Sequence, residues 1–170
     1  MREWRRAAQS HVRFETMNTV VRVRCDFDPT FPDLKSLPKG QDRIPGRPLA
    51  ELVVSGLRKR GFNASDVINE EPFFVTRCRS GEYEYQILSF LTYPDPAGPV
   101  WEVSCAPTIG FWGKLFGKSE DKELGPLLDA IHDTLKSDSH IKEMRWFPES
   151  SVSSDPFAEK KYATSPRSEI

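Results

Sequence analysis

Residues 82–93 read Glu82-Tyr-Glu-Tyr-Gln-Ile-Leu-Ser-Phe-Leu-Thr-Tyr93, and this stretch decides the fold. Side chains of alternate residues lie on opposite faces of a strand, so the period-two pattern predicts that this is the longest strand of a sheet. One face collects Tyr83, Tyr85, Ile87 and Leu91. Leu88 and Phe90 fall on the other face, which begins with glutamate, so we expect the far end of the strand to be covered on both sides.

Further strand patterns lie on either side of this stretch. They cover residues 19–25, 66–69, 73–78, 100–106 and 141–147, and the one at 66–69 is short. Ser80-Gly81 predicts a tight turn, and Pro94-Asp-Pro-Ala-Gly-Pro99 predicts a loop. Strands that follow one another through such short connections favour antiparallel pairing.

Two stretches have helical spacing instead. The first, Arg47–Gly61, has Pro48 in its first turn, leucine and valine at intervals of three and four, and a closing glycine. The second begins near Ser119 and ends near Ser137, with the apolar stripe Leu124, Leu127, Leu128, Ile131 and Leu135. Together the patterns predict an α+β fold with a mainly antiparallel sheet of five to six strands and two helices, in the order β-α-β-β-β-β-α-β.

The chain of 170 residues predicts one domain with a tail at each end. Residues 1–24 hold six arginines against two glutamates, and residues 1–16 lack a strand or helix pattern, so we expect a flexible basic lead there. From residue 149 the sequence is rich in serine with few apolar anchors, which predicts a disordered tail over 149–170. The domain proper is then expected at 17–148.

Composition excludes several classes of function. A net charge of -1 favours neither nucleic acid nor an anionic membrane. No run approaches the roughly 20 apolar residues that a transmembrane helix needs, and the N-terminus lacks the apolar core of a secretory signal. Cys25, Cys78 and Cys105 are far apart and odd in number, which argues against disulfides and favours a reducing compartment. The expected location is the cytoplasm.

Catalytic signatures are missing from the sequence. His11, His132 and His140 form no metal-binding spacing, and neither a nucleophile elbow nor a phosphate-binding loop occurs. We therefore predict no catalytic residue, metal or cofactor, and a protein that is not an enzyme. The alternative is a small hydrolase or transferase with a site on the open face of the sheet around Tyr83, Glu84 and Tyr85.

Ile109-Gly-Phe-Trp-Gly-Lys-Leu-Phe-Gly-Lys118 is the segment most in need of a function. Aromatic side chains on a loop make rigid contact anchors, and the following stretch 119–139 is acidic. These two features predict a partner-binding surface made by Phe111, Trp112, Lys114, Leu115, Phe116, Glu120 and Asp121. Two alternatives stay open: the loop folds back onto the sheet, or it inserts into a membrane surface as an adaptor.

Some of these patterns also occur together in known proteins. Leu49-Ala-Glu-Leu, Gly56-Leu-Arg-Lys-Arg-Gly-Phe62, the acidic Glu70-Glu71 before Phe73-Phe74-Val75 and the closing 135–146 segment resemble small bacterial α+β proteins, several of which look like immunity proteins. Such proteins neutralise a toxin by binding it. The resemblance covers residues 46–147 and implies a non-enzymatic protein-binding module that masks a partner protein.

Overall fold

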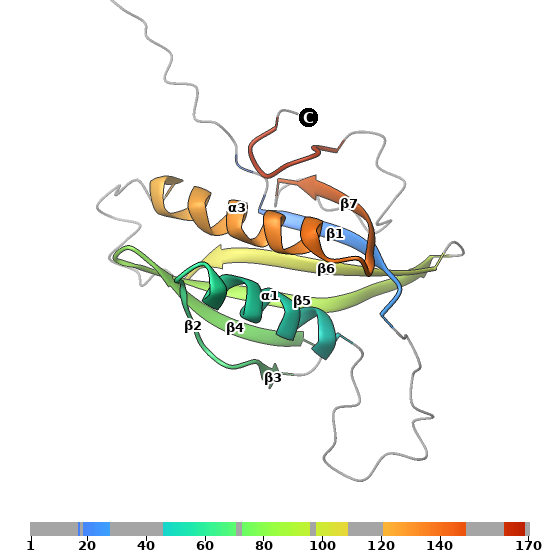
Figure 1. Cartoon of the computed structure of the whole chain (residues 1–170), viewed down its shortest axis with the longest axis horizontal. Helices are drawn as coiled ribbons and strands as arrows, with labels where there is room; N and C mark the ends of the chain where they lie inside the picture. The colour runs from blue at the N-terminus through green and yellow to red at the C-terminus, as the bar shows by residue number, and fades with distance from the viewer. Residues whose placement is uncertain are drawn as a thin grey trace, which may run out of the picture.

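The computed structural model describes residues 17, 19–27, 46–70, 73–95, 98–108, 121–148 and 162–168 (Figure 1). Its helices are α1 (Arg47–Lys59) and α3 (Asp121–Ser137). Its strands are β1 (Val20–Cys25), β2 (Asn63–Ala64), β3 (Ile68–Glu70), β4 (Phe73–Ser80), β5 (Tyr83–Asp95), β6 (Gly98–Pro107) and β7 (Ile141–Phe147). No helix in this part of the chain is long and apolar enough to cross a membrane.

The strands form one sheet in the order β2-β4-β5-β6-β1-β7, and β3 also pairs with β4. All pairings between these strands are antiparallel. The α+β class, the antiparallel sheet and the two helices are therefore confirmed. The predicted count of five to six strands is wrong, because the described part of the chain contains a 7-stranded sheet.

The extra strand is β2, so the order becomes β-α-β-β-β-β-β-α-β. It pairs Asn63 with Arg79 and Ala64 with Cys78, and the Arg58 Nε donates to the Ala64 carbonyl at 3.0 Å. Two residues are too few to show an alternating pattern, so this strand is defined by its partners rather than by its own sequence. The short strand β3 lies at 68–70, where 66–69 was expected.

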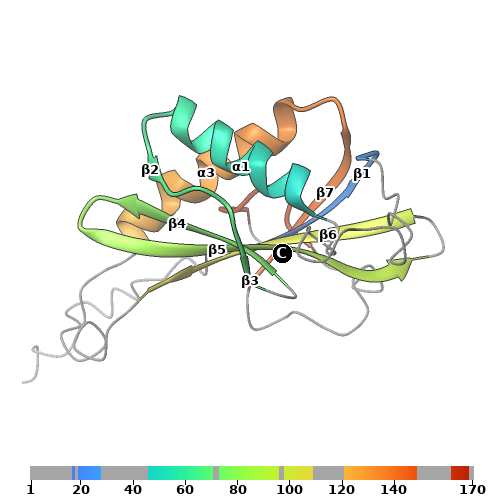
Figure 2. The ribbon, with the colours of Figure 1, turned by 90° about the horizontal axis from the view of Figure 1, so that it is seen from below.

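Both helices lie on the same face of the sheet (Figure 2). The two helices contact each other at Gly56 of α1 and Thr134 of α3. They approach so closely that a Cβ added to Gly56 would lie 2.1 Å from the Thr134 Oγ1. The Arg60 Nη1 donates to the same hydroxyl at 3.0 Å, and this hydroxyl donates to the Ala130 carbonyl at 2.7 Å. Helix α1 thus confirms the helix predicted from Pro48 and the leucine spacing.

The face of the sheet beneath the helices forms the core. Its fully buried side chains include Val21, Val23, Tyr85, Ile87, Val103 and Trp146. The opposite face is buried over part of its width as well, at Val20, Arg22, Val75, Val100, Glu102 and Phe147. Leu88 and Phe90 lie half-buried on this second face, and Phe90 contacts Phe73 edge-on with ring centroids 5.1 Å apart. The sequence indicated this two-sided cover.

Residues 162–168 pack onto the edge of the sheet, although the sequence placed them in a disordered tail. Ala163 forms an antiparallel bridge with Trp146 of β7, and both backbone hydrogen bonds measure 2.9 Å. Ala163 and Pro166 are buried. These small anchors are hard to recognise among serine and charged residues. We call residues 162–168 the C-terminal clasp; the predicted lead 1–16 and residues 149–161 lie outside the described residues.

Candidate functional site

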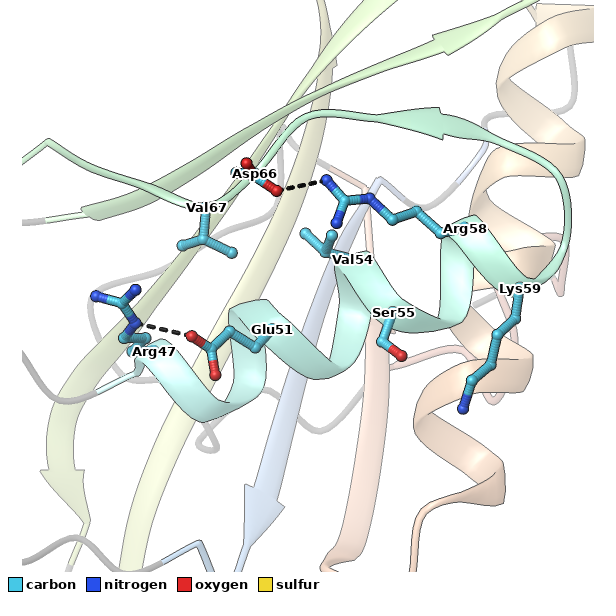
Figure 3. Close-up of a pocket in the computed structure, with 8 residues that line it drawn as sticks. All are labelled: Arg47, Glu51, Val54, Ser55, Arg58, Lys59, Asp66 and Val67. Atoms are coloured by element: carbon cyan, nitrogen blue, oxygen red, sulfur yellow. Dashed lines mark hydrogen bonds and ion pairs between the residues drawn. The ribbon is translucent and has the colours of Figure 1, made fainter.

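An open groove of about 560 Å³ runs between helix α1 and the connection from β2 to β3 (Figure 3). Its lining residues are Arg47, Glu51, Val54, Ser55, Arg58, Lys59, Asp66 and Val67. The groove forms because Gly61, at a φ of +85°, turns the chain after α1 so that the next segment returns alongside the helix. One wall is therefore helical and the other is an extended connection.

The floor of the groove is apolar. Val54 points from α1 toward Val67 on the connection (Figure 3). Val54 is buried and Val67 is half-buried. The two valines give the groove its apolar floor.

The rim of the groove is charged. Arg47 Nε donates to Glu51 at 2.8 Å, and Arg58 Nη2 donates to Asp66 at 2.7 Å (Figure 3). All four side chains are at least 47% exposed, so these pairs contribute little to stability and can exchange partners at low cost. Lys59 adds a third cation against the two carboxylates, and its side chain points away from the floor together with Ser55.

The surface predicted from sequence cannot be placed beside this groove. Phe111, Trp112, Lys114, Leu115, Phe116 and Glu120 lie outside the described residues. Asp121 begins α3, and its side chain also lies outside the described part. The aromatic loop therefore stays a prediction, and so do its two alternatives, folding back onto the sheet and insertion into a membrane surface.

Tyr83, Glu84 and Tyr85, the alternative enzymatic site, do not meet at one place. Tyr85 is 0% exposed in the core beneath the helices. Glu84 projects from the opposite face, where its carboxylate lies 3.9 Å from the Arg79 guanidinium. Successive strand residues point to opposite faces, so these three side chains cannot line one pocket on the open face of the sheet.

The three cysteines are buried in the sheet. Burial raises the pKa of Cys25 and of Cys78 to about 11 and raises the pKa of Cys105 as well. A thiol with a raised pKa stays protonated at neutral pH and is a poor nucleophile. The cysteines therefore serve packing.

The two described histidines have structural partners. His132 Nδ1 accepts a hydrogen bond from the Trp146 indole at 3.1 Å. His140 Nδ1 lies 2.9 Å from Asp138 Oδ1, and the His140 ring stacks on Phe27 with centroids 5.0 Å apart. Within the described ranges, no three His, Cys, Asp or Glu side chains gather as a metal site would require.

The groove has no signature in the sequence that marks it as a site. The Arg47–Glu51 spacing of four residues and the basic end of α1 are visible in the sequence. Such spacing usually marks a solvated helix face, and only the returning β2–β3 connection converts it into a groove wall. No protein-family model, curated protein or solved structure matches this chain.

Proposed function

We propose that this chain is a non-enzymatic protein-binding module of the kind that masks a partner protein, as immunity-type proteins do. The observation that carries the proposal is the groove beside α1, where an apolar floor of Val54 and Val67 is framed by exposed, exchangeable ion pairs. Protein interfaces have this anatomy: an apolar centre, a polar rim, and arginine as a favoured rim residue.

The charge around α1 indicates the kind of partner surface. The exposed side of the helix carries Arg47, Arg58, Lys59 and Arg60 against Glu51. An acidic partner surface would associate faster with this face, because opposite charges steer the encounter. The predicted surface at the aromatic loop and Asp121 is a second contact region of the same proposal.

Site-specific photo-crosslinking in source-cell extract tests the groove. A photoreactive side chain at Asp66, on the rim of the groove, should capture one major partner, whereas the same group at Asp133, exposed on α3, should not. Replacing Ser55, which lines the groove, with arginine adds bulk at its wall and should reduce the Asp66 crosslink severalfold without lowering the melting temperature. Equal capture from both positions would contradict a contact at the groove.

Trp112→Ala and Phe116→Ala test the sequence-predicted surface in the same assay. If the aromatic loop supplies the contact, the double variant keeps its melting temperature and loses partner capture. A large drop in melting temperature would instead assign these side chains to the core, and the groove would then be the contact region left in the proposal.

A further inference from the structure

The C-terminal clasp, residues 162–168, lies against β7 and α3, at the opposite end of the sheet from the groove beside α1 (Figure 1). It is a short segment that makes one bridge to the sheet and forms no helix. It contacts the domain through this bridge and a few side chains, as a bound peptide contacts its receptor. The surface beneath the clasp therefore has a visible occupant, whose contacts show what this surface accepts.

The first contact is made by the backbone. The Trp146 N–H donates to the Ala163 carbonyl, and the Ala163 N–H donates to the Trp146 carbonyl, both at 2.9 Å. The Ala163 side chain is 1% exposed and belongs to the same core cluster as Trp146. Because a protein core is close-packed, this position accepts a small side chain and excludes a large one.

The second contact is made by an arginine. Arg167 donates from Nε to one carboxylate oxygen of Asp129 at 3.2 Å and from Nη2 to the other at 2.5 Å. The planar guanidinium can make two such parallel bonds, and the ammonium of lysine cannot. Gly125 of α3 lies against the guanidinium, since a Cβ there would lie 2.8 Å from the Arg167 Nη2. Glycine is disfavoured inside a helix, so this residue suits the arginine better than it suits α3.

Two further side chains of the clasp face the domain. The centre of the Tyr162 ring lies 4.5 Å from the Arg145 guanidinium of β7, and Pro166 is buried. Thr164, in contrast, is exposed. The surface therefore receives an aromatic residue, a small residue directly after it, and the pair Pro166-Arg167.

The contacts of the clasp are easily exchanged. The side chains of Arg167 and Asp129 are 49% and 46% exposed, and exposed ion pairs contribute little to stability. Tyr162 is 41% exposed as well. A segment near the chain end with few buried contacts opens at a low free energy. Release of the clasp leaves the pairing of β7 with β1 in place, so the surface beneath it becomes available without unfolding the sheet.

We propose that the surface of β7 and α3 beneath the C-terminal clasp is a peptide-binding site, which the clasp occupies in the free protein and a segment of a partner protein takes over. The partner segment has the chemistry of the clasp: a small residue at the Trp146 bridge and an arginine four residues later at Asp129. This segment is basic, whereas the groove beside α1 suits an acidic surface. The inference therefore goes beyond the proposed function and does not depend on the groove.

A fluorescent peptide with the sequence of residues 162–170 tests whether the site accepts a ligand from another molecule. The clasp competes at an effective concentration on the order of millimolar, because it belongs to the same chain. In full-length Ala163→Pro, the clasp lacks the N–H that donates to Trp146. By fluorescence anisotropy, we expect this variant to bind the peptide at least about tenfold more tightly than the wild type does, the factor that about one net hydrogen bond provides.

Thr164→Ala is the matched control, because it changes an exposed residue of the same segment and should bind the peptide as the wild type does. Equal affinities of the wild type and Ala163→Pro would overturn the proposal, since the clasp would then not occupy the site of the peptide. If proline at position 163 prevents folding, Arg167→Ala releases the clasp from α3 instead. Absence of peptide binding by a folded released variant would also overturn the proposal.

Substitutions on α3 in the Ala163→Pro background test the arginine contact. Asp129→Asn removes the charge that pairs with the arginine of the peptide and should weaken binding severalfold. Asp133→Asn makes the same change one turn further along α3 and should leave the affinity unchanged. Gly125→Ala should weaken binding without lowering the melting temperature, because its methyl group enters the space of the guanidinium but favours the helix. Equal losses from the two asparagine variants would show general charge attraction and refute the site.

Variant peptides test whether the site recognises the chemistry of the segment. A peptide that keeps only the tyrosine, alanine, proline and arginine of the clasp should bind as tightly as the native sequence. Replacing its arginine with lysine should weaken binding severalfold. Binding of the native sequence alone would restrict the site to the clasp and refute a partner segment.

Hydrogen exchange of the wild type shows whether the peptide and the clasp compete for the same atoms. With excess peptide, the Ala163 N–H should lose its protection, because the clasp is displaced. The Trp146 N–H should keep its protection, because a carbonyl of the peptide replaces that of Ala163. Unchanged protection of both groups would place the bound peptide elsewhere and overturn the proposal.

Discussion

Trp146 places a chemical requirement on a single histidine. The indole N–H can only donate, so His132 Nδ1 must carry a lone pair, and the neutral ring holds its proton on Nε2. Burial is the main cause that lowers the pKa of His132, and the carboxylates of Asp133 and Asp129 act in the opposite direction. Lys136 also lowers this pKa, and Arg167 of the clasp neutralises part of the Asp129 charge. The folded protein therefore prefers the neutral ring.

His132 should make stability depend on pH. Its pKa is lower in the folded chain than the ordinary value of about 6.5, so the unfolded chain binds the proton first. This contribution to stability is complete above about pH 6.5 and is lost as the pH falls toward the folded pKa. We expect the free energy of unfolding to fall between about pH 7.5 and about pH 5.5, as measured by urea denaturation.

His132→Asn is the matched control for this pH dependence. The asparagine side chain keeps an acceptor oxygen near the position of Nδ1 and does not titrate. The decline in stability should therefore be shallower in this variant than in the wild type. Parallel pH profiles for the two proteins would mean that His132 does not contribute to the dependence.

At the level of elements, the sequence predicts the helices and strands that are long enough for the spacing of their apolar residues to repeat. Helix α1 and strand β5 repeat their apolar positions several times, so both were recognised. Strand β2 has two residues and the C-terminal clasp makes one bridge, and neither can show a period. The groove was missed for a related reason, since the returning segment that carries Asp66 and Val67 becomes a wall only through tertiary contact with α1.

The contact between α1 and α3 depends on a glycine. Glycine inside a helix normally costs about 1 kcal/mol relative to alanine. A Cβ on Gly56, however, would lie 2.1 Å from Oγ1 and 2.2 Å from Cγ2 of the buried Thr134. We expect Gly56→Ala to destabilise the fold by about 1–2 kcal/mol in urea denaturation, because overpacking exceeds the gain in helix propensity.

Thr134→Ala tests whether this clash is the cause. In the Gly56→Ala background it removes two of the three atoms that the new methyl group would meet. The double variant should therefore lose less stability than the sum of the two single changes. Simple additivity would show that the helices separate for another reason, and Ser55→Ala on the exposed side of α1 should be close to neutral.

At the scale of the whole molecule, β1 joins the two ends of the fold. It lies between β6 and β7, so the first strand of the sheet pairs with the last one in the sequence (Figure 1). On the face away from the helices, Arg22 of β1 donates to Glu102 of β6 at 2.9 Å, across 80 positions of sequence. The Arg22 guanidinium also lies 5.2 Å from the centre of the Phe147 ring of β7. One buried arginine thus contacts both neighbouring strands.

Removing one charge of the buried Arg22–Glu102 pair should lower the free energy of unfolding. The side chains of Arg22 and Glu102 are 2% and 8% exposed, so Arg22→Met leaves a desolvated carboxylate without its arginine. We expect a loss of about 3 kcal/mol or more in the free energy of unfolding, the cost of an uncompensated buried charge. Arg22→Met combined with Glu102→Leu removes both charges, and an apolar pair of similar volume recovers most of that loss.

Guanidinium denaturation of the wild type, the two single variants and the double variant measures the coupling between the two residues. A double variant as unstable as the sum of its parts would show that packing around Arg22, rather than its charge, holds β1 between β6 and β7.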